Sequence, residues 1–168
     1  NNIVKRLTYL NNKSDYIYKK DLLDSKINEY EKDHKITYDD KQKEAIKNAF
    51  LKNFLIITGG PGTGKTTIIK SIVSLYKDIF KVRDISEIVL LAPTGRASKR
   101  IMEATLFPAS TIHRFLKWNK DQNKFGINEH NKSKVRMVII DEFSMVDTYL
   151  FDSLLKYFDN LIYYYLRN

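Results

Sequence analysis

Cysteine is absent from this 168-residue sequence. Its absence excludes disulfides and thiolate-ligated zinc or iron–sulfur sites, and it suits a reducing cytoplasm. No apolar run approaches the roughly 18 residues that a membrane span requires, and the opening residues NNIVKRLTYL do not form a secretory signal. Internal repeats and low-complexity segments are also lacking. We therefore expect a cytoplasmic protein that has no membrane partner.

The length allows one well-buried domain, because domains typically contain roughly 100–200 residues. Hydrophobic residues make up 43% and charged residues 29% of the chain, as in ordinary globular proteins. The chain begins with Asn1 rather than with methionine. We therefore expect it to be a piece of a longer protein.

The net charge of +9 is concentrated in one part of the chain. Between Ala92 and Arg136, ten Lys and Arg residues stand against three acidic residues, which gives +7 for this basic segment. Clustered positive charge is typical of a surface that binds a polyanion. A solvated, lysine-rich loop face would have the same composition, so charge alone does not decide between the two.

Two helices are predicted before the first strand. In the first, apolar side chains recur at helical spacing at Tyr16, Leu23, Ile27 and Tyr30. Thr37, with Asp40 three residues on, resembles a capping box that starts the second, whose buried face would be Ala45, Ile46, Ala49 and Phe50. We therefore divide the chain into a helical N-terminal segment, residues 1–36, and a main domain, residues 37–168.

Short apolar strands then alternate with helices. The predicted strands are NFLIITGG, EIVLLAP and KVRMVIIDE, and NLIYYYLRN begins another at the end of the chain. The predicted helices are the one that carries Ile68, Ile69, Ile72, Val73 and Tyr76, then GRASKRIMEAT, the short STIHRFLKW, and SMVDTYLFDSLLKYF. Wholly apolar strands that alternate with helices indicate an α/β fold with a mostly parallel sheet and helices on both faces.

A phosphate-binding loop follows the first strand. Residues 59–66, GGPGTGKT, fit the pattern G-x-x-x-x-G-K-[ST], between a predicted strand and a predicted helix. Lys65 would reach the β- and γ-phosphates, and the Thr66 hydroxyl would ligate Mg²⁺. A chance glycine-rich turn is the alternative, and the order of strand, loop and helix disfavours it. We predict an ATP site formed by Gly60, Pro61, Gly62, Thr63, Gly64, Lys65, Thr66 and Thr67.

Two carboxylates end the strand KVRMVIIDE. Asp141 would hold the magnesium ion, and the adjacent Glu142 would orient an attacking water or take its proton. Taken alone, this pair reads as a polar strand end or a helix N-cap. Together with a phosphate loop it favours nucleotide hydrolysis, for which we assign catalytic roles to Lys65 and Glu142.

The basic segment contains a candidate site for backbone phosphates. In LLAPTGRASKRIMEAT a strand turns at Pro93 to Gly95 and a basic helix begins, which we expect one strand away from the nucleotide. STIHRFLKW adds further polar and basic residues. A lone histidine such as His113 is more often structural, and the spacing of Phe115 and Trp118 is more typical of core than of base stacking.

Four stretches in this order, LIITGGPGTGKTTIIK, LLAPTGRASKRIMEAT, STIHRFL and MVIIDEFSMVD, resemble the first motor lobe of RecD-like superfamily 1 DNA helicases, the exodeoxyribonuclease V alpha-subunit family. The resemblance covers roughly residues 36–158. It implies a RecA-like P-loop NTPase domain that moves 5′ to 3′ on single-stranded DNA, with nuclease or helicase subunits as partners. It implies that Gln42 reads the adenine. By the same resemblance, the DNA contacts would come from Thr94, Arg96, Arg100, Thr111, His113 and Arg114.

The sequence departs from this family at its end. In the family a Gly-Asp-x-x-Gln element and a second lobe follow, whereas this chain ends at Asn168, and Phe143 replaces a small residue. We therefore expect the chain alone to bind Mg-nucleotide, to hydrolyse it slowly and to unwind nothing. Two alternatives stay open: an AAA-type or other P-loop ATPase that remodels protein, and a nucleotide-gated binding module without turnover.

Overall fold

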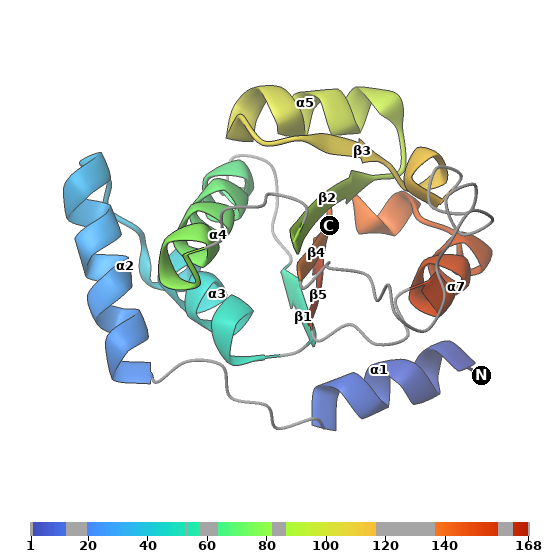
Figure 1. Ribbon diagram of the computed structural model, residues 1–168, viewed down its shortest axis with the longest axis horizontal. Helices are drawn as coiled ribbons and strands as arrows, with labels where there is room; N and C mark the ends of the chain where they lie inside the picture. Colours follow the sequence, from blue (N-terminus) through green and yellow to red (C-terminus); the bar gives the residue numbers. More distant parts are fainter. Residues whose placement is uncertain are drawn as a thin grey trace.

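The computed structural model describes residues 2–12, 20–52, 54–57, 64–81, 87–116, 137–157 and 163–167. Helices and strands alternate along most of this length (Figure 1). In chain order the elements are α1 (Asn2–Asn12), α2 (Lys20–His34), α3 (Asp40–Leu51), β1 (Phe54–Ile57), α4 (Lys65–Ile79), β2 (Ile88–Ala92), α5 (Gly95–Thr105), β3 (Ala109–Thr111), β4 (Met137–Ile140), η2 (Phe143–Met145), α7 (Thr148–Tyr157) and β5 (Tyr163–Arg167).

The strands form one parallel sheet in the order β1-β5-β4-β2-β3. The last strand of the chain, β5, therefore lies between the first strand and β4. The predicted strands, including the one begun by NLIYYYLRN, are all present. Because every pair is parallel, all five strands end at the same edge of the sheet, which we call the carboxyl edge.

Helices cover both faces of the sheet, as the continuous apolar strands predict. On one face, Met137 and Ile139 of β4 pack in a cluster with residues of α2, α3 and α4. On the other, Val138 and Ile140 pack with residues of α7 and with half-buried side chains of α1. The alternation within β4 follows from the two-residue repeat of a strand. Figure 1 shows the same arrangement, with α2, α3 and α4 on one side of the sheet and α1 and α7 on the other.

Helix α2 packs into the same apolar cluster as the phosphate-loop helix α4. Leu23 and Ile27 are fully buried there, as the helical stripe predicts, and Tyr30 packs against the cluster. An ion pair joins Lys26 to Asp78 at the end of α4. The structure thus joins α2 to the main domain by core contacts, and the boundary at residue 36 stays a prediction from sequence.

The prediction that α3 starts with a Thr37–Asp40 capping box is wrong. The N-cap is Asp39, whose Oδ1 accepts a hydrogen bond from the Gln42 backbone N–H at 2.7 Å, while Gln42 Oε1 accepts from the Asp39 N–H at 3.1 Å. Tyr38 explains the shift, because its buried ring and its N–H bond to Glu31 require an extended segment before the helix. Both residue pairs have the same spacing, so the sequence pattern could not separate them.

Two further boundaries differ from the sequence prediction. STIHRFLKW does not begin as a helix: Ser110 and Thr111 belong to strand β3, and helix occupies residues 112–116. SMVDTYLFDSLLKYF divides into the short η2 and the helix α7, which Asp147 caps by accepting from the Leu150 N–H. The WNKDQNKFGINEH stretch and Trp118 lie outside the described residues. Within the described helices, none combines the length and the apolar character that a membrane crossing requires.

Candidate functional site at the carboxyl edge

The carboxyl edge of the sheet gathers most of the predicted site residues. Strand β1 leads through the phosphate loop into α4, and β4 runs directly into Asp141 and Glu142. Strand β2 leads to Thr94, and β3 ends at Thr111, which pairs with Ala92 of β2. Strand β2 is the direct neighbour of β4, so Thr94 lies one strand from Asp141, whereas β5 and β4 separate β2 from β1 and the phosphate loop. The expected separation of one strand therefore holds for the predicted magnesium ligand and not for the phosphate loop.

The last residue of the phosphate loop has a conformation that favours glycine. Gly64 has φ +71°, in the left-handed region, and forms the N-cap of α4. A glycine cap offers no side chain to the first turn, so the amino end of α4 presents its backbone dipole, which attracts anions. Lys65 and Thr66 are the first two residues of this helix. The predicted contacts Gly60, Pro61, Gly62 and Thr63 lie outside the described residues.

Gln42 lies directly against this loop. A Cβ atom added to Gly64 would collide with the Gln42 amide nitrogen Nε2. Its other amide atom, Oε1, is held by the Asp39 backbone N–H. The capping box thus fixes the side chain that the sequence predicts to read adenine, and it leaves the amide nitrogen beside the loop.

The residues predicted to hold magnesium carry suitable donor atoms. A threonine hydroxyl at Thr66 and a carboxylate at Asp141 are hard oxygen ligands, which Mg²⁺ prefers. The Asp141 backbone is fixed, because its N–H donates to the Leu91 carbonyl at 2.9 Å. Its Oδ1 accepts from the Glu142 N–H, also at 2.9 Å. A carboxylate has acceptor sites for more than one partner, so Asp141 can hold a metal ion while it keeps the bond from Glu142.

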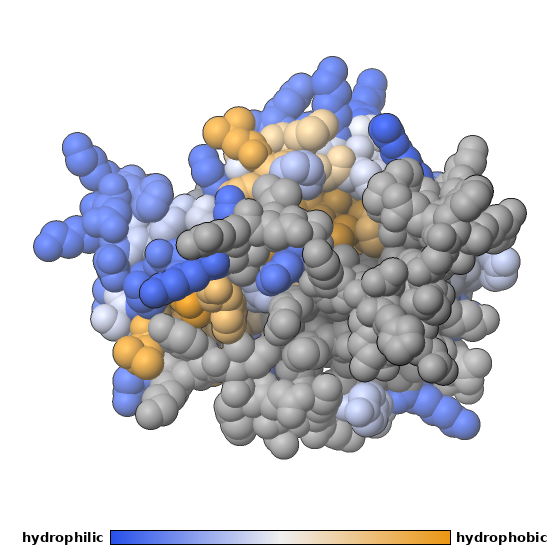
Figure 2. Space-filling view, viewed as in Figure 1, coloured by the Kyte–Doolittle hydropathy of each residue, from blue (hydrophilic) through white to orange (hydrophobic). Residues whose placement is uncertain are grey.

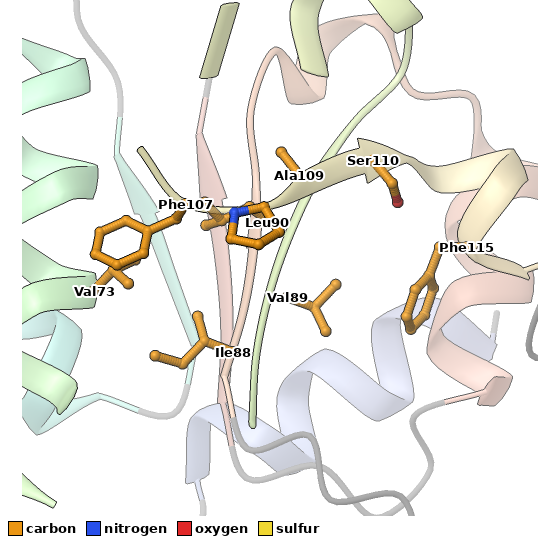
Figure 3. Close-up of a pocket in the computed structure, with 9 residues that line it drawn as sticks. Val73, Ile88, Val89, Leu90, Phe107, Ala109, Ser110 and Phe115 are labelled. Atoms are coloured by element: carbon orange, nitrogen blue, oxygen red, sulfur yellow. The ribbon is translucent and has the colours of Figure 1, made fainter. Parts of the chain in front are cut away.

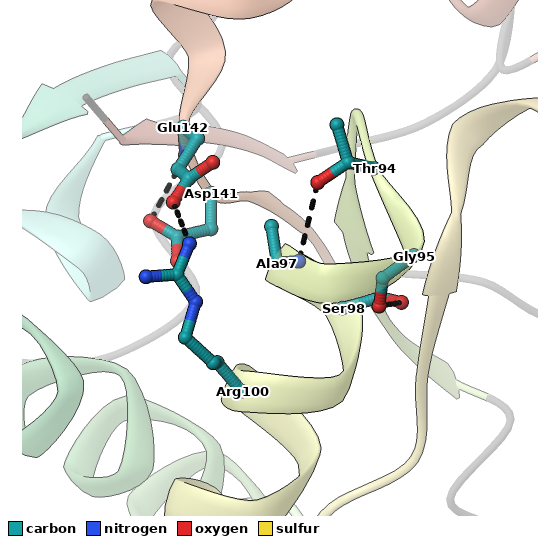
Figure 4. A network of polar contacts seen from close by, with 7 residues as sticks. All are labelled: Thr94, Gly95, Ala97, Ser98, Arg100, Asp141 and Glu142. Carbon is teal, nitrogen blue, oxygen red and sulfur yellow. Dashed lines mark hydrogen bonds and ion pairs between the residues drawn. The ribbon is translucent and has the colours of Figure 1, made fainter.

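Glu142 has a backbone conformation that non-glycine residues rarely adopt. Its φ is +52° and its ψ is +44°, a left-handed geometry that costs about 1 kcal/mol or more. The hydrogen bond to Asp141 on one side and a bond from the Met145 N–H to the Glu142 carbonyl on the other hold this turn. The chain therefore bends sharply after Asp141 and turns the Glu142 side chain towards α5 (Figure 4).

Arg100 contacts Glu142 rather than pointing freely to solvent. Its Nη2 atom lies 2.8 Å from Glu142 Oε1, and the two residues are 42 positions apart in the sequence (Figure 4). The Arg100 side chain is 64% exposed, whereas that of Glu142 is 30% exposed. Sequence reasoning assigned these residues to two different sites and missed their contact, because no local pattern encodes a pair between a helix and a distant strand end.

The two threonines predicted to contact DNA both cap helices. Thr94 Oγ1 accepts from the Ala97 N–H at 3.2 Å at the start of α5, and Thr111 Oγ1 accepts from the Arg114 N–H at 3.1 Å. A hydroxyl that accepts one bond still has its own O–H to donate. Each threonine can therefore cap its helix and also donate to an anion at the carboxyl edge.

The basic side chains near these threonines lie at the surface, as the predicted DNA contacts require, and the described aromatic side chain lies against the core. Arg96, His113 and Arg114 are exposed. Phe115 is half-buried and packs in the apolar cluster of α7, as the core interpretation predicts. The part of the basic segment from Lys117 to Arg136, which carries six of its ten Lys and Arg residues, lies outside the described residues. Hydrophilic residues cover the upper part of α2 in Figure 2, whereas a hydrophobic patch lies over the end of α5, where Met102 and Leu106 are exposed.

A buried hydrogen-bond chain supports α4 from behind. The Tyr38 hydroxyl donates to Ser71 Oγ, which in turn donates to the Thr67 carbonyl at 2.7 Å. Burial raises the pKa of Tyr38 to about 12. Sequence reasoning missed this chain, although a serine at a buried position of an apolar helix was a usable signal. Thr67, a predicted nucleotide contact, is itself exposed.

The structure also contains an apolar cavity of about 230 Å³ along β2 and the segment that leads into β3 (Figure 3). None of the described residues that line it is charged, and its walls include Val73, Ile88, Phe107 and Phe115. Phosphate groups would find no compensating charge there. The cavity is therefore separate from the nucleotide site at the carboxyl edge.

Known proteins match both the sequence and the fold. A family model described as an AAA domain matches residues 42–162. The RecBCD enzyme subunit RecD of Buchnera aphidicola is 35% identical over 136 residues, which are 70% of this chain and 22% of that protein. The ATP-dependent RecD2 DNA helicase of Deinococcus radiodurans is 38% identical over 101 residues, 60% of this chain and 13% of that protein.

Among solved structures, the UvsW helicase of bacteriophage T4 superimposes with a TM-score of 0.62 at 12% identity, covering 79% of this chain and 52% of that one. Such low identity supports the fold alone, an α/β RecA-like domain. The matched part of this chain spans 22% of the RecD relative and 13% of the RecD2 relative. Because the family model matches well over half of it, the chain belongs to the AAA domain family and is a RecD-like member of it.

Proposed function

We propose that this chain is the ATP-binding lobe of an ATP-dependent DNA helicase, which couples ATP hydrolysis to 5′-to-3′ movement on single-stranded DNA in recombination or repair. One observation carries the proposal: the carboxyl edge joins the start of α4, the carboxylates Asp141 and Glu142, and the hydroxyls of Thr94 and Thr111. Because the nucleotide site and the phosphate-binding surface lie on the same edge, a shift of β4 or β5, which lie between β1 and β2, can connect ligand binding at one to ligand binding at the other.

In the proposed reaction, the oxygen of a water attacks the γ-phosphorus of ATP. The bond from that phosphorus to the β–γ bridging oxygen breaks, and ADP leaves with that oxygen. Glu142 accepts the proton of the water, and Lys65 stabilises the charge that develops on the phosphoryl oxygens. Thr66 and Asp141 hold Mg²⁺, which when bound neutralises phosphate charge. Gln42 binds the adenine next to Gly64, which it already contacts.

Single-stranded DNA would lie across the ends of β2 and β3. The O–H groups of Thr94 and Thr111 donate to its phosphates, the exposed Arg96 and Arg114 supply charge-assisted bonds, and the exposed His113 offers a ring N–H. Arg100, on the same helix as Arg96, belongs to this proposed surface as well. The Deinococcus relative is named as an ATP-dependent DNA helicase, which favours DNA over a protein substrate.

Partners and location are proposed from the relatives and the sequence. The Buchnera relative is named as a subunit of the RecBCD enzyme. On that basis we propose that the parent protein assembles with nuclease or helicase subunits. A cytoplasmic location stays a prediction from the sequence.

ATP turnover with and without oligo-dT tests the proposal. Oligo-dT should raise the rate, and Glu142→Gln should lower the stimulated rate by about 100-fold or more, because it removes the proton acceptor. Glu103→Gln is the matched control, since Glu103 lies on the surface of α5 and pairs only loosely with Lys99, at 3.9 Å. Stimulation by a protein but not by oligo-dT would contradict the DNA assignment and favour a protein-remodelling ATPase. Equal loss in both variants would contradict the role of Glu142.

A further inference from the structure

Arg100 belongs to two groups of residues at once. It lies on α5 four residues after Arg96, a spacing that brings two side chains to one side of a helix, and so it extends the basic surface that follows Thr94. Its guanidinium also pairs with Glu142 at 2.8 Å (Figure 4). The contact therefore joins the candidate DNA surface to the proposed proton acceptor.

The ion pair holds Glu142 where its strained backbone directs it. The turn at Asp141 fixes the Glu142 backbone through two hydrogen bonds, so the freedom that is left belongs to the side chain. Within the described part of the chain, Arg100 is the one cation that forms an ion pair with this carboxylate. While Arg100 binds Oε1, the carboxylate of Glu142 is held towards α5.

An external anion can reach Arg100. Its side chain is 64% exposed, and a guanidinium forms paired hydrogen bonds with phosphate as readily as with carboxylate. An exposed ion pair is also weak, so a phosphate held nearby by Thr94 and Arg96 can compete with Glu142 for it. The nearest cation on the same helix, Lys99, pairs instead with Glu103 and has no contact with Glu142.

We propose that Arg100 is a positioning residue that restrains Glu142 until a phosphate of single-stranded DNA draws its guanidinium away. DNA binding thereby frees the carboxylate for proton transfer, within one lobe and through one side chain. The inference rests on the proposed function, in which Glu142 accepts the proton and DNA binds along α5.

The first test compares ATP turnover in the wild-type chain and three variants, each without DNA and with saturating oligo-dT. In Arg100→Gln, kcat without DNA should rise about 2- to 5-fold, the range that an exposed ion pair supports. The DNA-saturated kcat should stay near the wild-type value, so stimulation falls by the same factor, and KM for ATP should change little. The kcat of Arg100→Lys without DNA should lie between those of the wild type and Arg100→Gln, because lysine keeps the positive charge but lacks the paired N–H donors of a guanidinium.

Lys99→Gln is the matched control. It removes one positive charge from the same helix and should leave both the DNA-free kcat and the degree of stimulation unchanged. Two results would overturn the inference: an Arg100→Gln variant that is stimulated as strongly as the wild type, or one whose kcat falls with and without DNA. The second result would mean that Arg100 supports catalysis instead of restraining it.

A measurement without turnover separates failure of the inference from failure of the proposed function. The Arg100 side-chain Nε–H resonance, assigned by its loss in Arg100→Lys, should shift when oligo-dT is added in the absence of nucleotide. It should not shift with a non-hydrolysable Mg-ATP analogue alone. A shift with the analogue and none with oligo-dT would overturn the inference even if ATP turnover is stimulated by DNA. If oligo-dT shifts the Arg100 resonance but leaves the wild-type rate of ATP turnover unchanged, the result would instead count against the proposed function.

Discussion

Ion pairs do different work in two regions of this molecule. On the α2–α4 face, the Glu31–Lys43 and Lys26–Asp78 pairs join helices that also share an apolar core. At the carboxyl edge, the Arg100–Glu142 pair joins two groups with proposed functional roles, and the elements that carry them, α5 and β4, also share the apolar core through Ile101. Pairs between groups without a proposed functional role reinforce packing alone, whereas the arginine of the Arg100–Glu142 pair also faces the candidate DNA surface and can exchange its partner. The first region should therefore respond to mutation in stability and the second in ligand binding and turnover.

The largest effect should follow from a cavity in the α2–α4 face. Ile27→Ala removes a fully buried side chain, and it should lower the free energy of unfolding by about 2–5 kcal/mol. Leu22→Ala is the matched control on the same helix, because Leu22 is 51% exposed, and its effect should be small. Denaturant unfolding measures both. Nucleotide affinity in the folded Ile27→Ala chain should stay normal; a large loss of affinity would blur the distinction between the two regions.

A smaller effect is expected at the phosphate loop. Gly64→Ala forces alanine into the left-handed region and pushes Gln42 away from its capping position, which should weaken Mg-ATP binding about 10- to 30-fold. Gly95→Ala is the control, because an added Cβ meets nothing within 4 Å there. Titration of a fluorescent ATP analogue compares the two. Equal affinity in both variants would show that Gly64 and Gln42 do not form the nucleotide site.

A third prediction uses the acidity of Glu31. Burial alone would raise the pKa of Glu31, but hydrogen bonds from the Tyr38 N–H and Lys43 outweigh it and lower the pKa below its usual value. A carboxyl group whose pKa is lower in the folded state stabilises the fold above its unfolded pKa, and the stabilisation is lost as pH falls through the folded pKa.

Glu31→Gln should therefore cost about 1 kcal/mol at neutral pH, and the difference from wild type should shrink as pH falls below about 4. Unfolding in denaturant across this pH range measures it. Glu29→Gln is the control on the same helix, since Glu29 is exposed and its ion pair with Lys26 is long, at 3.8 Å. A stability difference that persists unchanged at low pH would contradict the linkage.

The smallest effect concerns the DNA surface. Arg114→Gln should weaken oligo-dT binding only a few-fold, and it should reduce the slope of log affinity against log salt by about 0.7, the value for one phosphate contact to a single strand. Lys32→Gln removes the same charge from α2, which lies on the far side of α4 from β3 (Figure 1), and should leave the slope unchanged. Titrations between about 50 and 200 mM salt compare them. Identical slopes in the wild type, Arg114→Gln and Lys32→Gln would show that Arg114 does not contact a DNA phosphate.

The sequence predicts the layers of this fold well, because each apolar strand and each helical stripe reports its own burial. Ile68, Ile69, Ile72, Val73 and Tyr76 are all buried, as their spacing indicates. Boundaries were harder: Asp39 replaces Thr37 as the cap because the burial of Tyr38 decides between two equal patterns. The order of strands is also non-local, since β5 enters between β1 and β4 from the end of the chain.

The candidate site divides in the same way. Loop and strand-end residues such as Lys65, Asp141 and Thr94 can be picked out because their local context is distinctive. The contact between Arg100 and Glu142 could not, because it depends on a left-handed turn at Glu142 and on the approach of α5 to the end of β4. Long-range contacts between exposed polar residues leave no periodic trace in a sequence.

We propose that the nucleotide site and the DNA surface at the carboxyl edge are coupled. The most direct test measures the Kd of oligo-dT with and without a non-hydrolysable Mg-ATP analogue, and the Kd of the analogue with and without oligo-dT. Coupling requires the same factor in both directions, about 5-fold or more for a typical linkage. A common factor of that size would support the coupling. If neither Kd changes when the other ligand is present, the coupling would be contradicted.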